Sequence, residues 1–363
     1  MRLFRHPAPK ALGPFSFWLS LPQLITWGSV FYTFSLLMQP LETELGMSRA
    51  ESSLAFSLAL LAEGAMAYAV GRWIDAGHER WVMSLAVKDK ISFYTSTDLK
   101  NWQHSGDFGE GLGAHGGVWE CPDLIKMRVK GSDEEKYVLL VSINPGGPNG
   151  GSATQYFVGD FDGKTFTLDP AFKQQLSAAK HSSPSEQAAV WLDYGTDNYA
   201  GVTWSDVPKQ DGRHLFIGWM SNWQYANKVP TQRWRSAMTI ARQLELEKRA
   251  DSYIVSSQPV ANLSSLASEA KMVRNSHVKA GQAVELVKLT QSAELGEHIK
   301  LELDLQQAKQ VELSFENAKH SLKLKIDAVA GELILERTKA GIADFDVKTE
   351  QYYLHVDPAV KVH

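Results

Sequence analysis

Hydrophobic positions divide the chain into three regions with different patterns. No charged residue occurs between residues 11 and 41, and a second apolar run, residues 52–71, is interrupted only by Glu63. Each run is long enough for a membrane-spanning helix of about 20 residues. After residue 80, short segments of alternating polar and apolar residues replace the long runs, and alternation persists beyond residue 245 without any further Trp. The chain is therefore expected to begin with helices and to continue with sheets.

The first region predicts a transmembrane-like helical hairpin, with helices over residues 15–38 and 52–71 and a polar link over residues 42–51. Basic residues flank the two runs on the outside, at Arg2, Arg5, Lys10, Arg72 and Arg80. By the positive-inside rule, both ends of the hairpin face the cytoplasm. Two other interpretations remain open: a signal peptide, although no A-x-A cleavage site follows, and two buried helices of a soluble protein.

Residues 71–80 close this region with a recognisable pattern. Gly71, Asp75, Gly77 and Arg80 resemble the loop that follows the second helix in major facilitator superfamily transporters, G-x-x-x-D-R-x-G-x-R. The Arg that normally follows the Asp is absent here, since Ala76 occupies its place. The resemblance implies a transporter-like segment attached to the membrane through residues 15–71, and two helices are too few to enclose a transport path.

The second region predicts antiparallel β-structure. Residues 82–87 and 91–96 alternate in polarity and are separated by Lys88-Asp89-Lys90, which is typical of a hairpin. Similar segments follow at residues 137–143, 155–159, 199–204, 215–220 and 236–244. Many short strands without a helical period indicate a sandwich, barrel or propeller. Residues 298–335 alternate with Lys or Glu on one side, which predicts a further sheet with one wet face.

Composition narrows the function classes. The formal net charge is −4, which argues against nucleic acid as a partner because phosphate binding favours a basic surface. The single cysteine, Cys121, excludes an intrachain disulfide, and the scattered His residues form no metal-ligand spacing, so neither a metal nor a cofactor is expected. The chain has 11 Trp, a residue that stacks on sugar rings but equally often fills a core.

The strongest chemical motif is Trp119-Glu120-Cys121-Pro122-Asp123. A Glu beside Trp and Cys is expected in a partly apolar setting, which favours the protonated carboxyl that a general acid needs. Taken alone, such a Glu is more often a surface residue. The context is a set of further motifs in fixed order: Ile91-Ser92-Phe93-Tyr94, Asp98 to Trp102, Asn144 to Ser152, Asp193 to Ala200, and Gly218 to Thr231.

Together these motifs resemble glycoside hydrolase family 32, the invertase, levanase and inulinase family, from about residue 81 onward. The resemblance implies a mainly β fold: an incomplete five-bladed β-propeller over residues 81–250 and a partial β-sandwich over residues 251–363, after the hairpin of residues 1–80. It also implies a retaining hydrolase acting on terminal β-D-fructofuranosyl units of sucrose, levan or inulin. Glu120 matches the acid/base residue of the family, and the residues expected at the sugar are Cys121, Asp197, Trp219, Asn222 and Trp223.

The sequence departs from the family at its remaining catalytic carboxylates. The family's nucleophile lies in an Asn-Asp-Pro motif and its transition-state stabiliser in an Arg-Asp-Pro motif, and neither tripeptide occurs in the chain. We therefore expect a chain truncated at both ends, joined to the transporter-like segment by gene fusion or sequence misassembly, with impaired activity. The alternatives are a non-catalytic fructan-binding or vestigial module and a membrane transporter fragment. If the hairpin inserts, the hydrolase-like part lies on the cytoplasmic side.

Overall fold

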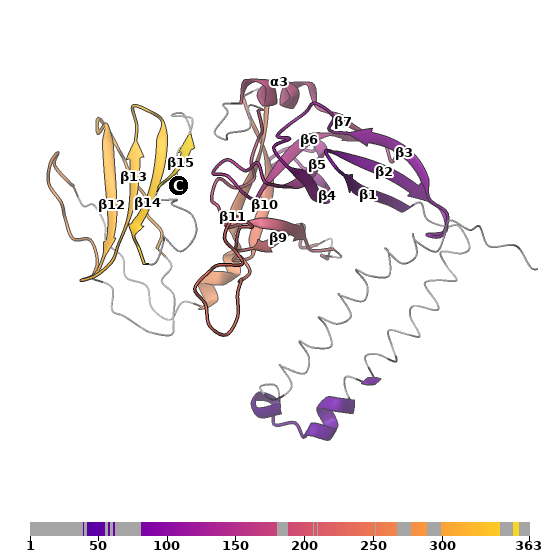
Figure 1. The fold of residues 1–363 in the computed structure, drawn as a ribbon, viewed down its shortest axis with the longest axis horizontal. Coiled ribbons are helices and arrows are strands. Elements are labelled where there is room, and N and C mark those ends of the chain that lie inside the picture. Colours follow the sequence, from indigo (N-terminus) through magenta and orange to yellow (C-terminus); the bar gives the residue numbers. More distant parts are fainter. Residues whose placement is uncertain are drawn as a thin grey trace, which may run out of the picture. The chain divides into compact units, whose positions relative to one another are not determined.

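The computed structural model describes the backbone and side chains of residues 39, 42–54, 57–58, 61, 81–179, 188–205, 207–208, 210–250, 252–266, 277–288 and 299–341, and the backbone of residues 351–355. The chain divides into two compact units, residues 1–79 and 80–363. The described part of the second unit is mainly β, as the alternating pattern predicted (Figure 1).

The described part of the first unit is helical at residues 39, 42–45, 49–54, 57–58 and 61, so the described residues of the helix expected at 52–71 are helical. Ser48 and Glu51 form a capping box, in which Glu51 Oε2 accepts from Ser48 N at 2.8 Å and Ser48 Oγ accepts from Glu51 N at 3.3 Å. The segment expected to be a polar link thus contains a helix start. The expected helix at residues 15–38 lies outside the described residues. Within the part that is described, no helix is both long and apolar enough to cross a membrane.

The first sheet has three antiparallel strands in the order β1 (Trp81–Val87), β2 (Lys90–Ser96) and β3 (Gln103–Phe108). The predicted hairpin is confirmed, with Val87 paired with Lys90 across the turn. Lys88 occupies the left-handed region there, at φ 60°.

The second sheet is a four-stranded meander of β4 (Val118–Arg128), β5 (Glu135–Asn144), β6 (Ala153–Phe161) and β7 (Phe166–Leu168). Residues 138–143 of β5 are all buried, which explains why they are apolar except for Ser142, whose hydroxyl bonds to that of Thr154. Helix α3 (Pro170–Ala178) follows β7 and begins at Asp169, whose side chain accepts from the backbone N–H groups of Ala171 and Phe172.

The third sheet contains β8 (Tyr199–Thr203), β9 (His214–Trp219), β10 (Arg242–Arg249) and β11 (Ser252–Pro259), again in meander order. The domain boundary expected at residue 250 falls in the turn between β10 and β11, which pair along their whole length. A short 3₁₀-helix, η1 (Ala261–Leu266), follows.

The strand predicted over residues 236–244 is wrong in its first half. Regular pairing begins only at Arg242, and Met238 and Ile240 are exposed while Thr239 between them is buried. Thr239 Oγ1 accepts from Gly218 N at 3.0 Å, which places the polar residue inside. Exposed and buried residues do alternate over Met238, Thr239 and Ile240, but the apolar residues are the exposed ones.

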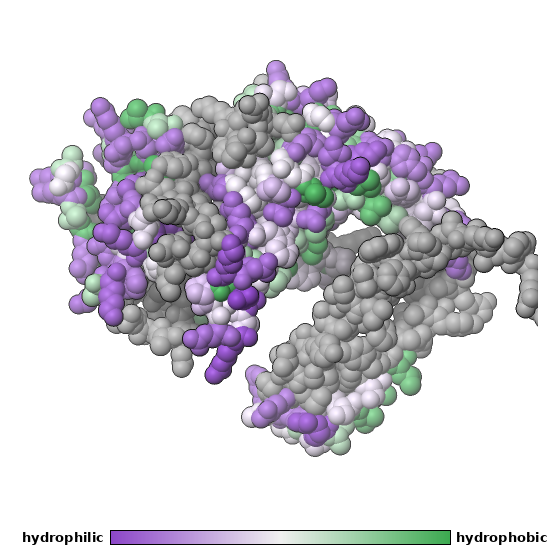
Figure 2. Space-filling view, viewed as in Figure 1, coloured by the Kyte–Doolittle hydropathy of each residue, from purple (hydrophilic) through white to green (hydrophobic). Residues whose placement is uncertain are grey.

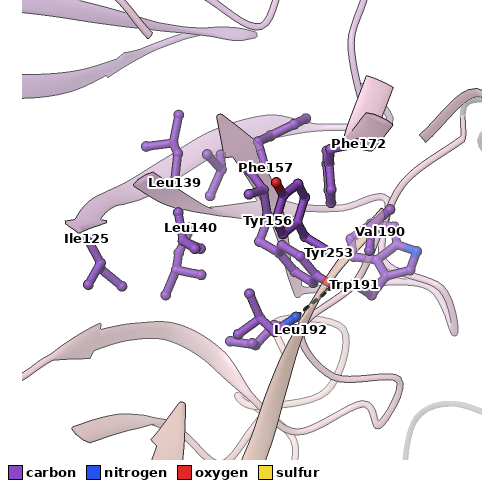
Figure 3. Close-up of a cluster of buried hydrophobic side chains, with 14 of the residues drawn as sticks. Ile125, Leu139, Leu140, Tyr156, Phe157, Phe172, Val190, Trp191, Leu192 and Tyr253 are labelled. Carbon is purple, nitrogen blue, oxygen red and sulfur yellow. Dashed lines mark hydrogen bonds between the residues drawn. The ribbon is translucent and has the colours of Figure 1, made fainter. Parts of the chain in front are cut away.

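The second sheet packs between the other two. Strand β4 contacts β1 on one side and β8 on the other, and Val129, which follows β4, bridges to Leu246 of β10. Buried residues of β2, β4, β5, β6, α3, β10 and β11 form one continuous core (Figure 3). Four-stranded meanders packed through their first strands are typical of a β-propeller.

A fourth sheet consists of β12 (Gln310–Glu316), β13 (Ser321–Asp327), β14 (Glu332–Lys339) and β15 (Gln351–His355). The register aligns Leu313, Leu324 and Leu335 across three strands, while Glu312, Lys323 and Lys325 form ion pairs on the other face. The predicted sheet with one charged face is thus confirmed. In the view of Figure 2, the described surface is mainly hydrophilic, with hydrophobic residues in small patches.

Candidate active site

The candidate site is built on a β-bulge in β4. The pairing of β4 with β5 shifts register between Glu120 and Asp123. Cys121 within the bulge has φ 47°, in the left-handed region that residues other than glycine rarely adopt. Bulges re-aim side chains next to active sites, and the two carboxylates on either side of this bulge, Glu120 and Asp123, both bond to strand β8.

Strand β8 holds both ends of the bulge. The Tyr199 hydroxyl donates a short hydrogen bond to Glu120 Oε2. Four residues later, Thr203 donates to Asp123 Oδ2 from its backbone N–H and from its hydroxyl, both at 2.8 Å. Burial, together with the hydrogen bond to Glu120, raises the pKa of Tyr199 far above its ordinary value. Tyr199 therefore remains a protonated donor at neutral pH.

Trp119 does not surround the Glu120 carboxyl, contrary to the expectation from the motif. Consecutive strand residues point to opposite faces, so Trp119 is 1% exposed in the core while Glu120 is exposed. The Trp119 ring stacks on His115 at 4.8 Å and its Nε1 donates to Ala114 O at 2.8 Å. Trp119 thus anchors β4 from behind the site.

The loop before β4 is also tied to β6 by the side chain of Gln155. The fully buried Gln155 of β6 accepts from Ala114 N at 2.9 Å and donates to Ala114 O at 3.2 Å. These two hydrogen bonds satisfy the main chain of Ala114 as a neighbouring strand would. The loop that leads into Glu120 is therefore held in a defined position.

Cys121 is exposed and next to the candidate acid. Partial desolvation and the neighbouring Glu120 carboxylate raise the pKa of its thiol. The thiol consequently remains protonated at neutral pH and does not act as a nucleophile there.

Aromatic side chains extend from Tyr199 across β9. Tyr199 pairs with Trp219 in the β8–β9 register, and their ring centroids lie 6.3 Å apart. The Trp219 ring lies 5.1 Å from that of Trp223, which is 49% exposed. Three residues predicted at the sugar or the reaction centre, Glu120, Trp219 and Trp223, are thus connected through Tyr199.

Asn222 differs from the expectation that it contacts a sugar, because it is fully buried. Its Oδ1 accepts from the backbone N–H groups of Ser152 and Gln224, and its Nδ2 donates to Thr196 O at 2.9 Å. The side chain therefore joins three loops from below the surface. A Cβ on Gly151, at φ +66°, would lie 2.1 Å from Asn222 Oδ1, so this approach requires glycine.

Two further carboxylates lie on the loop before β8. Asp197 accepts a short hydrogen bond from the Tyr225 hydroxyl. Asp193 pairs with Arg242 at 2.7 Å and accepts from Gly195 N at 2.7 Å. Within the described ranges, no three His, Cys, Asp or Glu side chains gather as a metal site.

Tyr199 begins the strand predicted over residues 199–204, but the sequence assigns it no role at the site. The pattern gives little indication of one, because 79 positions separate Tyr199 from Glu120. Its place two residues after Asp197, at the start of a strand, was the available indication.

The sequence matches a known protein family over the residues that build this site. Residues 72–259, more than half of the chain, match the Glycosyl hydrolases family 32 N-terminal domain. The chain belongs to glycosyl hydrolase family 32. The match ends at the last residue of β11 and includes the bulge, the aromatic residues and Asn222.

Curated relatives of this family 32 chain are fructan hydrolases. It is 46% identical over 198 residues to a levanase of Bacillus subtilis, covering 54% of the chain and 27% of the levanase. It is 35% identical over 284 residues to an extracellular exo-inulinase of Aspergillus niger, covering 76% of the chain and 50% of the inulinase. The chain thus spans half or less of the length of these relatives.

Solved structures of family 32 share the fold. The exo-inulinase of Aspergillus awamori aligns with a TM-score of 0.57 at 28% identity, covering 76% of this chain and 52% of that one. The β-fructofuranosidase of Schwanniomyces occidentalis, complexed with fructosyl-erythritol, aligns with a TM-score of 0.56 at 26% identity, covering 77% and 54%.

Proposed function

We propose that this chain carries the acid half of a β-fructofuranosidase site and binds a fructose-containing saccharide such as sucrose, levan or inulin. The observation that carries the proposal is Glu120, an exposed carboxyl on the β4 bulge that is held by Tyr199 beside the Trp219 and Trp223 rings. The fructan hydrolases among its relatives support the substrate class.

The proposed chemistry is general acid catalysis. Protonated Glu120 gives its proton to the glycosidic oxygen as the bond from that oxygen to the anomeric carbon breaks, so the leaving alcohol departs neutral. Trp219 and Trp223 provide apolar ring faces for the sugar, and Cys121 and Asp197 complete the proposed set of sugar contacts. Asn222 supports this surface from below.

Retaining hydrolysis also needs a second carboxylate about 5–5.5 Å from the acid, as nucleophile. The Asn-Asp-Pro and Arg-Asp-Pro motifs are absent from the chain, and three nearby Asp residues have structural partners: Thr203 for Asp123, Arg242 for Asp193 and Tyr225 for Asp197. General acid catalysis alone provides roughly 10²- to 10⁴-fold acceleration. We therefore expect the 363-residue chain to be impaired in hydrolysis.

A reducing-sugar assay on the purified chain tests this proposal, with sucrose, levan and inulin as substrates. Little or no fructose release is expected, equal in the chain and in Glu120→Gln. Robust release that Glu120→Gln abolishes would contradict the impairment and reveal a carboxylate that completes the site. Titration calorimetry with levan and inulin oligosaccharides tests binding independently, and absence of heat for both would overturn the proposed substrate class.

The second candidate function is a non-catalytic fructan-binding module. This function is favoured because Asp123, Asp193 and Asp197 already have structural partners. The Trp219 and Trp223 surface is therefore left without a carboxylate that we can assign as nucleophile. Saccharide binding that persists in Glu120→Gln and is lost in a Trp219→Ala, Trp223→Ala double variant would support this function.

The proposed architecture is an incomplete five-bladed propeller, with the sheets from β1 to β11 as its blades, and a partial sandwich that includes β12 to β15. We place the boundary between them after Pro259, because β10 and β11 belong to one sheet. The transporter-like hairpin of residues 1–80, and with it any membrane attachment, remains a prediction from sequence.

A further inference from the structure

The Tyr199–Glu120 hydrogen bond joins two neighbouring sheets at the candidate acid. Tyr199 is 3% exposed and begins β8, whereas Glu120 lies on the bulge of β4. The hydroxyl donates to Glu120 Oε2, so one of the two carboxyl oxygens is already engaged. The other, Oε1, is left as the oxygen that can carry a proton toward a substrate.

The Tyr199 ring is itself held in place. Its register partner Trp219 lies on β9, and the two rings meet edge to face. Four residues further along β8, Thr203 holds Asp123 with two hydrogen bonds. Because both ends of the bulge are held by the same strand, neither carboxylate can rotate without losing its hydrogen bonds to β8.

We infer that Tyr199 is a positioning residue that holds Oε2 of Glu120 and thereby assigns the acidic proton to Oε1. This inference rests on the proposed role of Glu120 as proton donor. As the proton leaves Oε1, negative charge spreads over both oxygens, and a hydrogen bond to a charged oxygen is stronger than one to a neutral oxygen. Tyr199 keeps its own proton throughout and forms no covalent bond.

Two neighbouring groups of β4 act on the Tyr199 phenol. Glu120 and Cys121 are the groups that raise the pKa of its phenol, together with burial. The Cys121 thiol titrates at alkaline pH, since its own pKa is raised. A change at Tyr199 that disappears when the Glu120 carboxyl is replaced therefore depends on their hydrogen bond.

The test places 3-fluorotyrosine at position 199 alone and follows its fluorine NMR shift from about pH 3 to pH 7, where carboxyl groups ionise. We expect a sigmoidal change in the otherwise unaltered chain and its loss in Glu120→Gln. A shift that is flat in both proteins would overturn the inference. The readout needs no turnover, so it is independent of whether the chain hydrolyses fructosides.

A second labelled site is the matched control. The Tyr253 hydroxyl donates a short hydrogen bond to Glu134, away from the bulge. 3-Fluorotyrosine at position 253 should titrate equally with and without Glu120→Gln. If Glu120→Gln abolished the change at both positions, the variant would have disturbed the fold as a whole, and the specific link between Tyr199 and Glu120 would be refuted.

Discussion

Lys136 shows how a single buried charge is accommodated beside the core. Its Nζ lies 2.9 Å from Asp169 Oδ2 and 3.0 Å from Asp160 Oδ2, with Lys136 14% and Asp169 8% exposed. Although burial opposes it, the Lys136 ammonium and the N–H groups of Phe172 and Ala171 lower the pKa of Asp169. The pair therefore stabilises the fold only while Asp169 is ionised.

We predict that Asp169→Asn destabilises the protein by about 2 kcal/mol in urea unfolding at pH 7. Removing one partner of a buried pair costs about 3–5 kcal/mol, but Asn remains a good helix N-cap and Lys136 keeps Asp160. Because the folded pKa is depressed, the contribution is present above the unfolded value of about 3.9 and is lost as pH falls through the folded pKa. The difference in unfolding free energy between Asp169→Asn and the wild-type protein should thus become smaller below about pH 4.

Asp160→Asn is the matched control, since Asp160 contacts the same ammonium but its side chain is 65% exposed. Its unfolding midpoint should remain close to that of wild type. Equal destabilisation by both variants would show that the burial of Asp169 is not what matters.

Gly151 tests the support beneath the candidate site. Gly151→Ala should lower stability by more than about 2 kcal/mol, because it combines a left-handed φ with a Cβ placed on Asn222 Oδ1. Gly131→Ala has a similar φ of +78° with open space around it, so it should cost only about 1 kcal/mol. Thermal unfolding of both variants measures the difference, and equal losses would exclude a role for the Asn222 contact.

Single residues were also where the sequence was least informative about the site. Glu120 could be identified from its motif, but the burial of Asn222 and the contact of Tyr199 depend on loops and strands distant in sequence. Hydrogen bonds across 70 or 79 positions leave no periodicity to detect. Such contacts are known only once the sheets are packed.

At the scale of elements, β8 acts as the partner that fixes the β4 bulge. Thr203→Val removes the hydroxyl donor to Asp123 and preserves the side-chain shape, leaving only the backbone donor. We predict a loss of about 1.5–3 kcal/mol in denaturant unfolding, as expected for a hydrogen bond to a charged group. Thr203→Ser retains the hydroxyl and should recover most of the loss. A Ser variant as unstable as the Val variant would assign the effect to packing instead.

Elements were predicted well where burial follows the strand period and poorly where it does not. The β1–β2 hairpin and β12 to β14 have regular alternation and were found. Strand β10 was misplaced because Met238 and Ile240, outside any strand, alternate with Thr239 and yet face outward. Pattern alone identifies which positions share a face, and packing decides which face is buried.

The whole molecule should not unfold uniformly. Buried residues 138–143 of β5 lie at the centre of the core, whereas β12 to β14 contribute no residue to it and are only partly buried. Hydrogen exchange should therefore be at least about 10²-fold slower in β5 than in β13, since local opening of less buried elements requires less free energy. Equal protection of the two strands would indicate a single cooperative unit.

The hydrogen bonds of Gln155 to Ala114 determine which positions of the loop before β4 can be varied by protein engineering. Gln155 bonds Ala114 only through main-chain atoms, but the Ala114 side chain is fully buried, so position 114 itself has to remain small. The exposed Glu110 can be exchanged while the loop keeps its path into Glu120, whereas Gly111 has to stay because its φ of +70° favours glycine. Variation of this loop at position 110 therefore leaves the scaffold and the candidate acid in place.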